Sequence, residues 1–525
     1  MDKIKNIIKK KNKKIILLLI IILAIQSIIY IYAGSKKEGF HIDEYLTYQL
    51  SNGVFGLSDP IENGKIYNTN PFKKCFVVDN ETRFNYKGVW ENQKRDVHPP
   101  FYYTLVHTVS SFMPGVFTKW IGIGINIFLA IFVTLLIYFI AKELSKLSIL
   151  SLVVAATFAV LPGTVNSILF IRMYVFLSIW VLSISFLHLK YYNKERIDNK
   201  FYVLLTLIAI CGTMTQYYFL IFLFFICLFF GIHLILKKNW KDVLKYITSL
   251  AIAGIISIIT FPSMIIQIFG SGYRGIESFE NLSSSDFGSR FATYFEIIKN
   301  QIFGSRLSTA FLVILILVIV GLNLKRIKVK LFWCFKNFMI LAFPVITYFL
   351  LVVKISPYLT DRYVFCIYPF IWIAFILTLY WELNQITTSK KMHREYIAIL
   401  LISSFFIIYG YKLGIPYMYK DEAKNIEISK DRGADTILCI YDNQQWKLMS
   451  SYIELDNYEN MVFMAKNQIN NLEMSQYNKL DNIQIYISAT LNQDEIIQQI
   501  LQLYTKYSTA QYLYSPNYGN VYQLQ

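Results

Sequence analysis

Long apolar stretches alternate with short polar connectors through residues 15–413. Eleven of these stretches are long enough to cross a hydrocarbon core of about 30 Å as helices. They are residues 15–32, 117–140, 148–166, 171–189, 201–219, 220–236, 246–268, 307–323, 335–353, 363–381 and 395–413. This pattern predicts an all-α polytopic membrane domain over residues 15–413.

Lysine and arginine gather in alternate connectors between these runs. The basic connectors are 142–146, 190–200, 237–245, 325–330 and 390–394. Positively charged loops remain in the cytoplasm, so residues 1–14, which form a basic tail, are also expected there. The first loop, residues 33–115, and the C-terminal segment are then extracytoplasmic in a multi-pass protein of the cell membrane.

Residues 99–113 are apolar but short, and they begin with Pro99 and Pro100. Counting this segment as a crossing would place every later basic connector outside the cell. We therefore expect a juxtamembrane helix in the outer interface, with the prolines at its start. A short re-entrant pair with the next run is the alternative.

Residues 414–525 are polar enough to form a small folded domain outside the membrane. Two segments, 435–441 and 482–488, resemble β-strands, and 493–507 has apolar residues at helical spacing. These elements predict a small extracytoplasmic α/β domain.

Composition supports a membrane protein and argues against other classes. The chain has 525 residues, 55% hydrophobic and 16% charged, with a mean hydropathy of +0.42. The net charge of +17 resides mainly in the connectors, so it does not indicate a nucleic-acid surface. Six cysteines without a CxxC pair predict neither a zinc site nor a disulfide framework.

Carboxylates lie at both ends of the first loop. Asp43 and Glu44 follow the first apolar run, and Asp96 and His98 close the loop. A loop tethered at both ends can bring these side chains into one cleft, where carboxylates accept a proton or position an acceptor. Two alternatives remain: Asp43 and Glu44 cap a helix, or the four residues bind a divalent metal. Our prediction is an enzyme without a cofactor.

Two arginines are candidates for binding an anionic group. Arg362, at the mouth of the tenth run, can hold phosphate oxygens in two directions. The alternative is an interfacial anchor paired with Asp361. Arg172 lies just inside an outward-facing end, where an arginine is energetically costly. A structural pair with a carboxylate is the alternative there.

The remaining substrate-binding candidates are polar and aromatic residues near the outer ends of the runs. They are His98, Gln216, Tyr217, Arg274 and Tyr363. Aromatic rings at this level can stack on a sugar or simply anchor a helix at the interface. Arg274 lies in a glycine-rich loop that can close over a phosphate or serve only as a connector.

Several of these motifs together resemble the GT-C glycosyltransferases, particularly the bacterial family 39 and protein-mannosyltransferase-like group. The similarity covers residues 15–413 and not the C-terminal domain. The matching elements are Asp43-Glu44, the DxHPPxYY sequence at 96–103, Pro162-Gly163, Arg172-Met-Tyr174, Thr215 to Tyr218, and Arg362-Tyr363.

The resemblance implies an inverting transferase whose base is an acidic residue of the first external loop, here Asp43. Its donor would be a polyprenyl-phosphate monosaccharide, and its acceptor a glycan, lipid or protein of the cell envelope. Relatives commonly carry an arginine where this chain has Lys119. Lysine keeps the charge but loses the fork geometry, which puts a donor-binding role there in doubt.

Three other functions are compatible with the sequence. A lipid-linked glycan polymerase or ligase would need the same lipid and the same cations. A transporter would place ionisable residues near mid-membrane, where this chain is almost entirely apolar. A non-catalytic relative would use its soluble domain for binding.

Overall fold

The computed structural model describes most of the chain. The described residues are 2–54, 61–270, 274–283, 286–323, 331–386, 394–432, 435–442, 444–471 and 482–525. They form two compact units. The helical unit comprises residues 1–35, 96–102 and 122–416, and the sheet unit comprises 36–95, 103–121 and 417–525.

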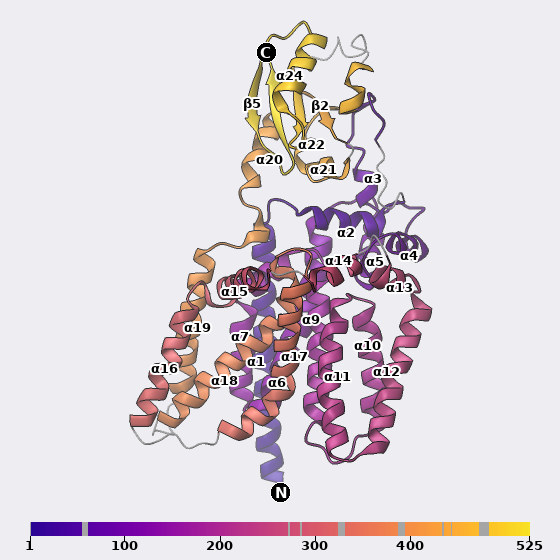
Figure 1. Cartoon of the computed structure of the whole chain (residues 1–525). Coiled ribbons are helices and arrows are strands. Elements are labelled where there is room, and N and C mark those ends of the chain that lie inside the picture. Colours follow the sequence, from indigo (N-terminus) through magenta and orange to yellow (C-terminus); the bar gives the residue numbers. More distant parts are fainter. Residues whose placement is uncertain are drawn as a thin grey trace. The chain divides into compact units, whose positions relative to one another are not determined.

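The helical unit consists of long and short helices (Figure 1). They are α1 (Asp2–Ser35), α6 (Lys119–Ser145), α7 (Ser148–Ala159), α8 (Pro162–Leu169), α9 (Tyr174–Tyr191), α10 (Asn199–Thr213), α11 (Tyr218–Leu236), α12 (Trp240–Thr260), α13 (Ser263–Phe269), α14 (Arg274–Asn281), α15 (Phe287–Phe303), α16 (Leu307–Asn323), α17 (Leu331–Ile355), α18 (Tyr368–Ile386) and α19 (Arg394–Lys412). The 3₁₀ turns η1 (Asp361–Tyr363) and η2 (Phe365–Ile367) precede α18.

Among the described residues, eight helices are long and apolar enough to cross a membrane, and ten if two bent pairs each count as one span. Each of the eleven predicted crossings contains a helix, which confirms a polytopic helical fold. The crossing predicted at 201–219 contains α10, which has only 15 residues. The crossing predicted at 246–268 contains α12 and α13, the one at 148–166 contains the bent pair α7 and α8, and each of the others contains one long helix.

Both bends have a local cause. Helices α7 and α8 meet at 56°, because Pro162 lacks an N–H and starts α8 as its first residue. Helices α15 and α16 meet at 69°, and Gly304 ends α15 in the left-handed conformation with a φ of 55°. The chain therefore changes direction where the sequence supplies a proline or a glycine.

Neighbouring helices pack closely within the helical unit. Helix α10 packs between α9 and α12, and α11 packs against α17, as Figure 1 shows for the central bundle. Aromatic rings fill the contact between α11 and α17: Phe222 of α11 meets Tyr348 of α17 edge-on, with ring centroids 6.1 Å apart. Such pairs contribute about 0.5–1.5 kcal/mol beyond the area that they bury.

The sheet unit combines short helices with six strands. The helical elements are α2 (Ile42–Asn52), α3 (Lys73–Phe76), α4 (Tyr86–Lys94), α5 (Phe101–Ser111), η3 (Pro416–Met418), α20 (Glu422–Asp431), α21 (Trp446–Met449), α22 (Tyr452–Leu455), η4 (Lys466–Asn471) and α24 (Gln493–Leu503). The strands are β1 (Ile66–Tyr67), β2 (Thr436–Tyr441), β3 (Asn460–Ala465), β4 (Ile483–Ser488), β5 (Ala510–Tyr514) and β6 (Gly519–Leu524). Helix α5 follows Pro99 and Pro100, where a juxtamembrane helix was expected.

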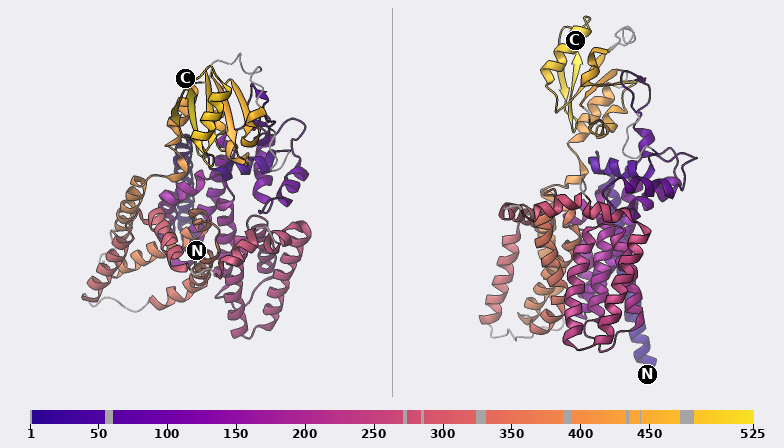
Figure 2. Two further views of the ribbon diagram at one scale, coloured as in Figure 1. Left: turned by 45° about the horizontal axis from the view of Figure 1, so that its top comes forward. Right: turned by 45° about the vertical axis from the view of Figure 1, so that its right-hand side comes forward.

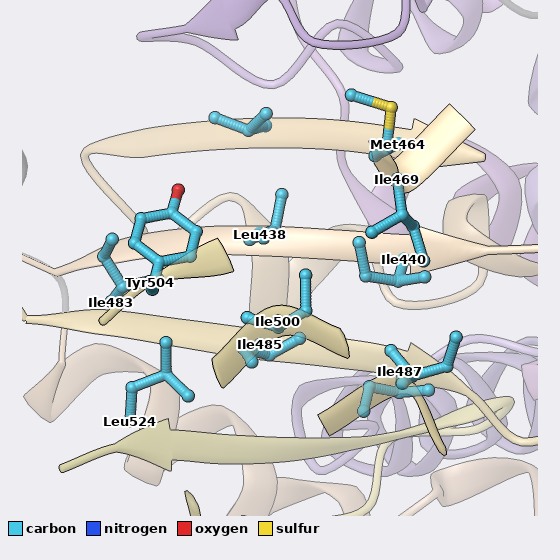
Figure 3. Packing of buried hydrophobic residues seen from close by; sticks show 12 residues of the cluster. Leu438, Ile440, Met464, Ile469, Ile483, Ile485, Ile487, Ile500, Tyr504 and Leu524 are labelled. Atoms are coloured by element: carbon cyan, nitrogen blue, oxygen red, sulfur yellow. The ribbon is translucent and has the colours of Figure 1, made fainter. Parts of the chain in front are cut away.

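The sheet has the strand order β1-β3-β2-β4-β6-β5. Strand β2 lies at its centre and runs parallel to both β3 and β4, while β6 is antiparallel to β4 (Figures 2 and 3). Every residue of β2 and of β4 is buried, as expected for strands covered on both faces. These two strands and α24 confirm the predicted C-terminal α/β domain.

Apolar side chains from the central strands and from α24 form the core of the sheet unit (Figure 3). Leu438 and Ile440 of β2 lie beside Ile485 of β4, and Ile496 and Ile500 of α24 cover them. Burying each such side chain contributes about 1.5–3 kcal/mol. This core explains why 493–507 carries apolar residues at helical spacing.

The first loop contributes a strand to the same sheet. Strand β1 pairs antiparallel with β3, joining Ile66 to Val462. The side-chain oxygen of Asn63 accepts hydrogen bonds from the Tyr441 hydroxyl and the Ala465 N–H, both at 2.9 Å. The first loop therefore groups with residues 417–525, whereas the sequence pattern assigned it to the membrane domain at 15–413.

Candidate functional site

In the sheet unit, the candidate residues Asp43 and Glu44 lie in the first turn of α2. His41 is the N-cap, and its Nδ1 accepts a hydrogen bond from the Asp43 N–H at 3.1 Å. The Glu44 carboxylate accepts one from the His41 N–H at 2.7 Å. This reciprocal capping box fixes where the helix begins and orients the Glu44 carboxylate.

Glu44 forms a fully buried ion pair. Its Oε2 lies 3.0 Å from the Lys37 Nζ, and both side chains have 0% exposure. Lys37 also donates to the carbonyl of Tyr417 at 2.9 Å. Burial lowers the pKa of Lys37, although the Glu44 carboxylate opposes that shift. Glu44 was a catalytic candidate, but its carboxylate is enclosed and already accepts two hydrogen bonds.

Asp43 is the accessible carboxylate of the pair, with a side chain 19% exposed. Its Oδ2 lies 3.6 Å from the Nδ1 of His41. Because that nitrogen accepts from the Asp43 N–H, the His41 ring proton resides on Nε2 and the ring is neutral. The positive end of α2 stabilises the ionised form of Asp43.

In the helical unit, Asp96, His98 and Arg172 form a chain of hydrogen bonds. Asp96 Oδ2 lies 2.9 Å from His98 Nδ1, and His98 Nε2 lies 3.3 Å from Arg172 NH2. A guanidinium can only donate, so Nε2 accepts and Nδ1 carries the proton that bonds Asp96. This arrangement brings three of the predicted residues together.

Tyr217, which caps the start of α11, and Gln267 of α13 hold the main chain of the same cluster. Gln267 Nε2 donates to the Asp96 carbonyl at 2.8 Å, and the hydroxyl of Tyr217 donates to Gln267 Oε1. Burial alone would raise the pKa of Asp96, but His98 and Arg172 hold it below its ordinary value. Asp96 is therefore an ionised carboxylate at neutral pH.

Asn126 holds the backbone just before Arg172 through hydrogen bonds. Its side-chain N–H₂ donates to the carbonyls of Ile168 and Phe170, at 3.0 and 2.8 Å. These groups lie where α8 ends, and the bonds satisfy them inside the unit. The Tyr102 hydroxyl donates to the side-chain oxygen of Asn126 at 3.1 Å. The break between α8 and α9, which carries Arg172, is thus held to the segment that carries Asp96.

Arg362 lies in η1, the 3₁₀ turn before α18, and is 8% exposed. Its guanidinium carbon lies 5.2 Å from the ring centroid of Tyr363 and 5.8 Å from that of Tyr358. Asp361 accepts a hydrogen bond from the Asn166 amide at 2.8 Å. The turn is therefore oriented by α8, and the guanidinium lies over aromatic faces.

Contacts between aromatic rings join the two arginine-bearing segments. Tyr174, the first residue of α9, meets Tyr363 edge-on with ring centroids 6.1 Å apart. Tyr363 also stacks on Tyr218, the first residue of α11, at 4.9 Å. Because Tyr174 lies two residues after Arg172 and Tyr363 directly follows Arg362, both arginines come from adjoining breaks between helices.

The remaining substrate-binding candidates, Gln216 and Arg274, lie where helices start. Gln216 is 3% exposed, and its backbone N–H closes the turn between α10 and α11 by donating to Gly212 at 3.1 Å. Arg274 is the first residue of α14, and its side chain lies outside the described residues. Lys119 donates to the Lys37 carbonyl, a contact within the sheet unit.

Sequence reasoning missed several residues that orient the candidates. Lys37, His41 and Gln267 bond a predicted residue or its main chain, and Asn166 bonds Asp361, next to the predicted Arg362. Gln267 had a usable signal, because it is the one polar side chain in the apolar run Met264 to Phe269. In the described parts of the chain, no three His, Cys, Asp or Glu side chains gather as metal ligands would.

No protein-family model matches the chain, and no curated protein matches it. Its fold matches solved structures over almost its whole length. ArnT from Cupriavidus metallidurans, bound to undecaprenyl phosphate, aligns over 96% of this chain and 97% of its own, with a TM-score of 0.52 and 8% identity. This protein has the GT-C glycosyltransferase fold.

Further GT-C structures align with lower scores. ArnT from the same organism in the apo state has a TM-score of 0.48 and 7% identity, over 96% of this chain and 97% of that one. The archaeal oligosaccharyltransferase AglB from Archaeoglobus fulgidus, with an inhibitory peptide and a dolichol-phosphate, has a TM-score of 0.42 and 11% identity, over 96% and 74%. The match to ArnT with undecaprenyl phosphate confirms the expected GT-C fold.

Proposed function

We propose that this protein is an inverting glycosyltransferase that moves a monosaccharide from a polyprenyl-phosphate donor to a cell-envelope acceptor. The observation that carries the proposal is the pair of arginines, Arg172 and Arg362, on adjoining helix breaks of a GT-C fold. Guanidinium groups bind phosphate through paired hydrogen bonds. The solved ArnT with this fold was bound to undecaprenyl phosphate, which supports a lipid phosphate as the donor group.

The reaction is a single displacement. The acceptor hydroxyl oxygen bonds to the anomeric carbon while the bond from that carbon to the phosphate oxygen breaks. The acceptor proton passes to the Asp43 carboxylate, and the polyprenyl phosphate leaves with its negative charge held by Arg172 and Arg362. Attack opposite the leaving phosphate inverts the anomeric configuration.

The other candidates support these groups. Glu44 and Lys37 are positioning residues, because their buried pair fixes the start of α2 and thereby Asp43. Asp96 and His98 hold Arg172 in its orientation. Tyr217 acts through Gln267 on the same main chain.

The test is transfer of radiolabelled sugar from polyprenyl-phosphate donors in membranes that contain the wild type or Asp43→Asn. We expect the near-isosteric amide to reduce transfer about 10²-fold or more, because it accepts no proton. Glu81→Gln is the matched control, since Glu81 is an exposed carboxylate of the same loop. Undiminished transfer by Asp43→Asn would place the base elsewhere, and products longer than one sugar would indicate a polymerase.

A further inference from the structure

The carboxyl ends of β2 and β4 meet at a point where the chain changes direction across the sheet. After β2 the chain turns through α21 and α22 to β3, on one side of β2. After β4 it turns through α24 to β5 and β6, on the other side. In open α/β sheets, ligands bind beyond the carboxyl ends of the strands at such a switch point.

A polar cluster occupies this edge. Asp442 directly follows β2, and its Oδ2 accepts hydrogen bonds from Lys447 Nζ at 2.7 Å and from the Thr490 hydroxyl. The hydroxyl oxygen of Thr490 lies 3.1 Å from that of Ser488, the last residue of β4. Asp442 is 21% exposed and Thr490 is exposed, so oxygen atoms of this cluster reach the surface.

The charge of this cluster is balanced. Burial would raise the pKa of Asp442, but hydrogen bonds from Lys447 and Thr490 hold it below its ordinary value. One carboxylate and one ammonium, 2.7 Å apart, leave little net charge at the site. The Asp442 carboxylate would repel a phosphate bound beside it. The cluster therefore favours a neutral ligand rich in hydroxyl groups.

Two aromatic rings border the same cluster. Trp446 is 38% exposed, and its ring centroid lies 5.4 Å from that of Tyr518. The Nζ of Lys447 lies 5.8 Å from the Trp446 ring, and the Tyr518 carbonyl accepts from the Ala489 N–H at 2.8 Å. An exposed tryptophan beside a polar cluster offers a flat apolar face next to hydrogen-bonding groups.

We propose that the edge formed by Asp442, Trp446, Lys447, Thr490 and Tyr518 is a carbohydrate-binding site. The C–H groups on one face of a pyranose ring pack against Trp446, with Tyr518 beside it. Hydroxyl groups of the same sugar donate to Asp442 and exchange hydrogen bonds with Thr490. The inference is independent of the proposed transfer chemistry, and its ligand is a neutral glycan, either free or carried on a lipid.

The test is binding of the fluorescently labelled full-length protein to an array of neutral hexose and N-acetylhexosamine oligosaccharides. Lauryldimethylamine oxide should be the detergent, because its head group is not a sugar. We expect at least one of these two glycan classes to bind, and Trp446→Ala to weaken that binding at least about tenfold. Asp442→Asn, which keeps the shape of the side chain, should also weaken it.

Tyr512→Ala is the matched control, because Tyr512 is an exposed aromatic residue of β5 in the same unit, 54% exposed. Competition by free oligosaccharide, or by the same glycan on a lipid in liposomes, distinguishes the two sources. The proposal is overturned if neither class binds, or if Trp446→Ala binds as the wild type does. The assay contains no donor, so its outcome is separate from that of the transfer test.

Discussion

At the scale of single residues, the buried pair of Lys37 and Glu44 shows how a charged residue can act without touching substrate. Both side chains have 0% exposure, and each has a second partner in the main chain. Removing two charges from water is costly, and only mutual attraction and full hydrogen bonding offset that cost. The pair therefore stabilises the start of α2 only while both members are present.

Lys37→Met should destabilise the sheet unit by about 3–5 kcal/mol, because it leaves the Glu44 carboxylate buried without its counter-charge. The double variant Lys37→Met with Glu44→Gln should recover part of that loss. Thermal unfolding of the purified protein measures both effects. Equal unfolding temperatures for the single and double variants would contradict the coupling.

Two other carboxyl groups of the sheet unit have pKa values raised far above the ordinary range of a glutamate. Burial, followed by repulsion from Glu454, raises the pKa of Glu422 to about 8, and burial raises that of Glu454 to about 7. Glu422 packs so closely on Gly39 that a Cβ there would overlap its carboxylate. Its Oε1 accepts from the Asn517 amide at 3.2 Å.

Stability of the sheet unit should therefore fall as the pH rises from about 4.5 to about 8. The folded unit holds protons in this interval that the unfolded chain has already released, so deprotonation favours unfolding. Unfolding temperatures measured between about pH 5.5 and about pH 8.5 should show this slope. Glu422→Gln removes one titrating group and should flatten it; an unchanged slope would assign the effect to other groups.

At the scale of the elements, helix breaks position the candidate residues. The break between α8 and α9 carries Arg172, and the turn before α18 carries Arg362. A third break, between α15 and α16, packs main chain against main chain, which a glycine without a Cβ allows. Gly304 lies between α15 and α16, against the backbone of α19 at Tyr409 and Gly410.

Gly304→Ala should destabilise the helical unit by at least about 1–2 kcal/mol, the cost of a left-handed conformation for a residue with a Cβ. The added carbon would also lie 2.7 Å from the carbonyl carbon of Tyr409, so α19 would have to move. Gly124→Ala is the control, because no atom lies within 4 Å of its added carbon. Thermal unfolding in detergent compares them, and equal losses would refute the packing argument.

At the scale of the whole molecule, the sheet unit is assembled from three separate stretches of the chain. Strand β1 of the first loop pairs with β3 of the C-terminal stretch, and Lys37 donates to the carbonyl of Tyr417. Neither stretch carries all of its own hydrogen-bond partners. The first loop and the C-terminal stretch should therefore fold together.

Removal of residues 417–525 should make the first loop sensitive to trypsin, because β1 loses its partner strand and Lys37 loses its carbonyl acceptor. Limited proteolysis of membranes, followed by mass spectrometry, would detect cleavage at Lys65 and Lys74. Removal of residues 2–11 is the control and should leave the loop protected. A loop that resists trypsin equally in both truncated proteins would show that it folds alone.

Elements with a local pattern of residues could be predicted without the structure. Apolar runs predicted a helix at each of the eleven crossings, and apolar clusters predicted β2 and β4 within one residue of their ends. The bends at Pro162 and Gly304 were not predicted, because residues 148–166 were expected to form one crossing and Gly304 lies outside the predicted runs. Hydrophobic burial and backbone geometry act on neighbouring residues, so they leave a readable pattern.

Contacts between residues far apart in the chain could not be predicted and appear only in the folded protein. Strand β1 has two residues and no pattern of its own, so its pairing with β3 is visible only in the sheet. Asp43 and Glu44 are adjacent and chemically alike, yet Lys37 and the α2 cap enclose one and leave the other partly exposed. Hydrogen bonds and ion pairs join residues far apart in sequence, and chain spacing carries no record of them.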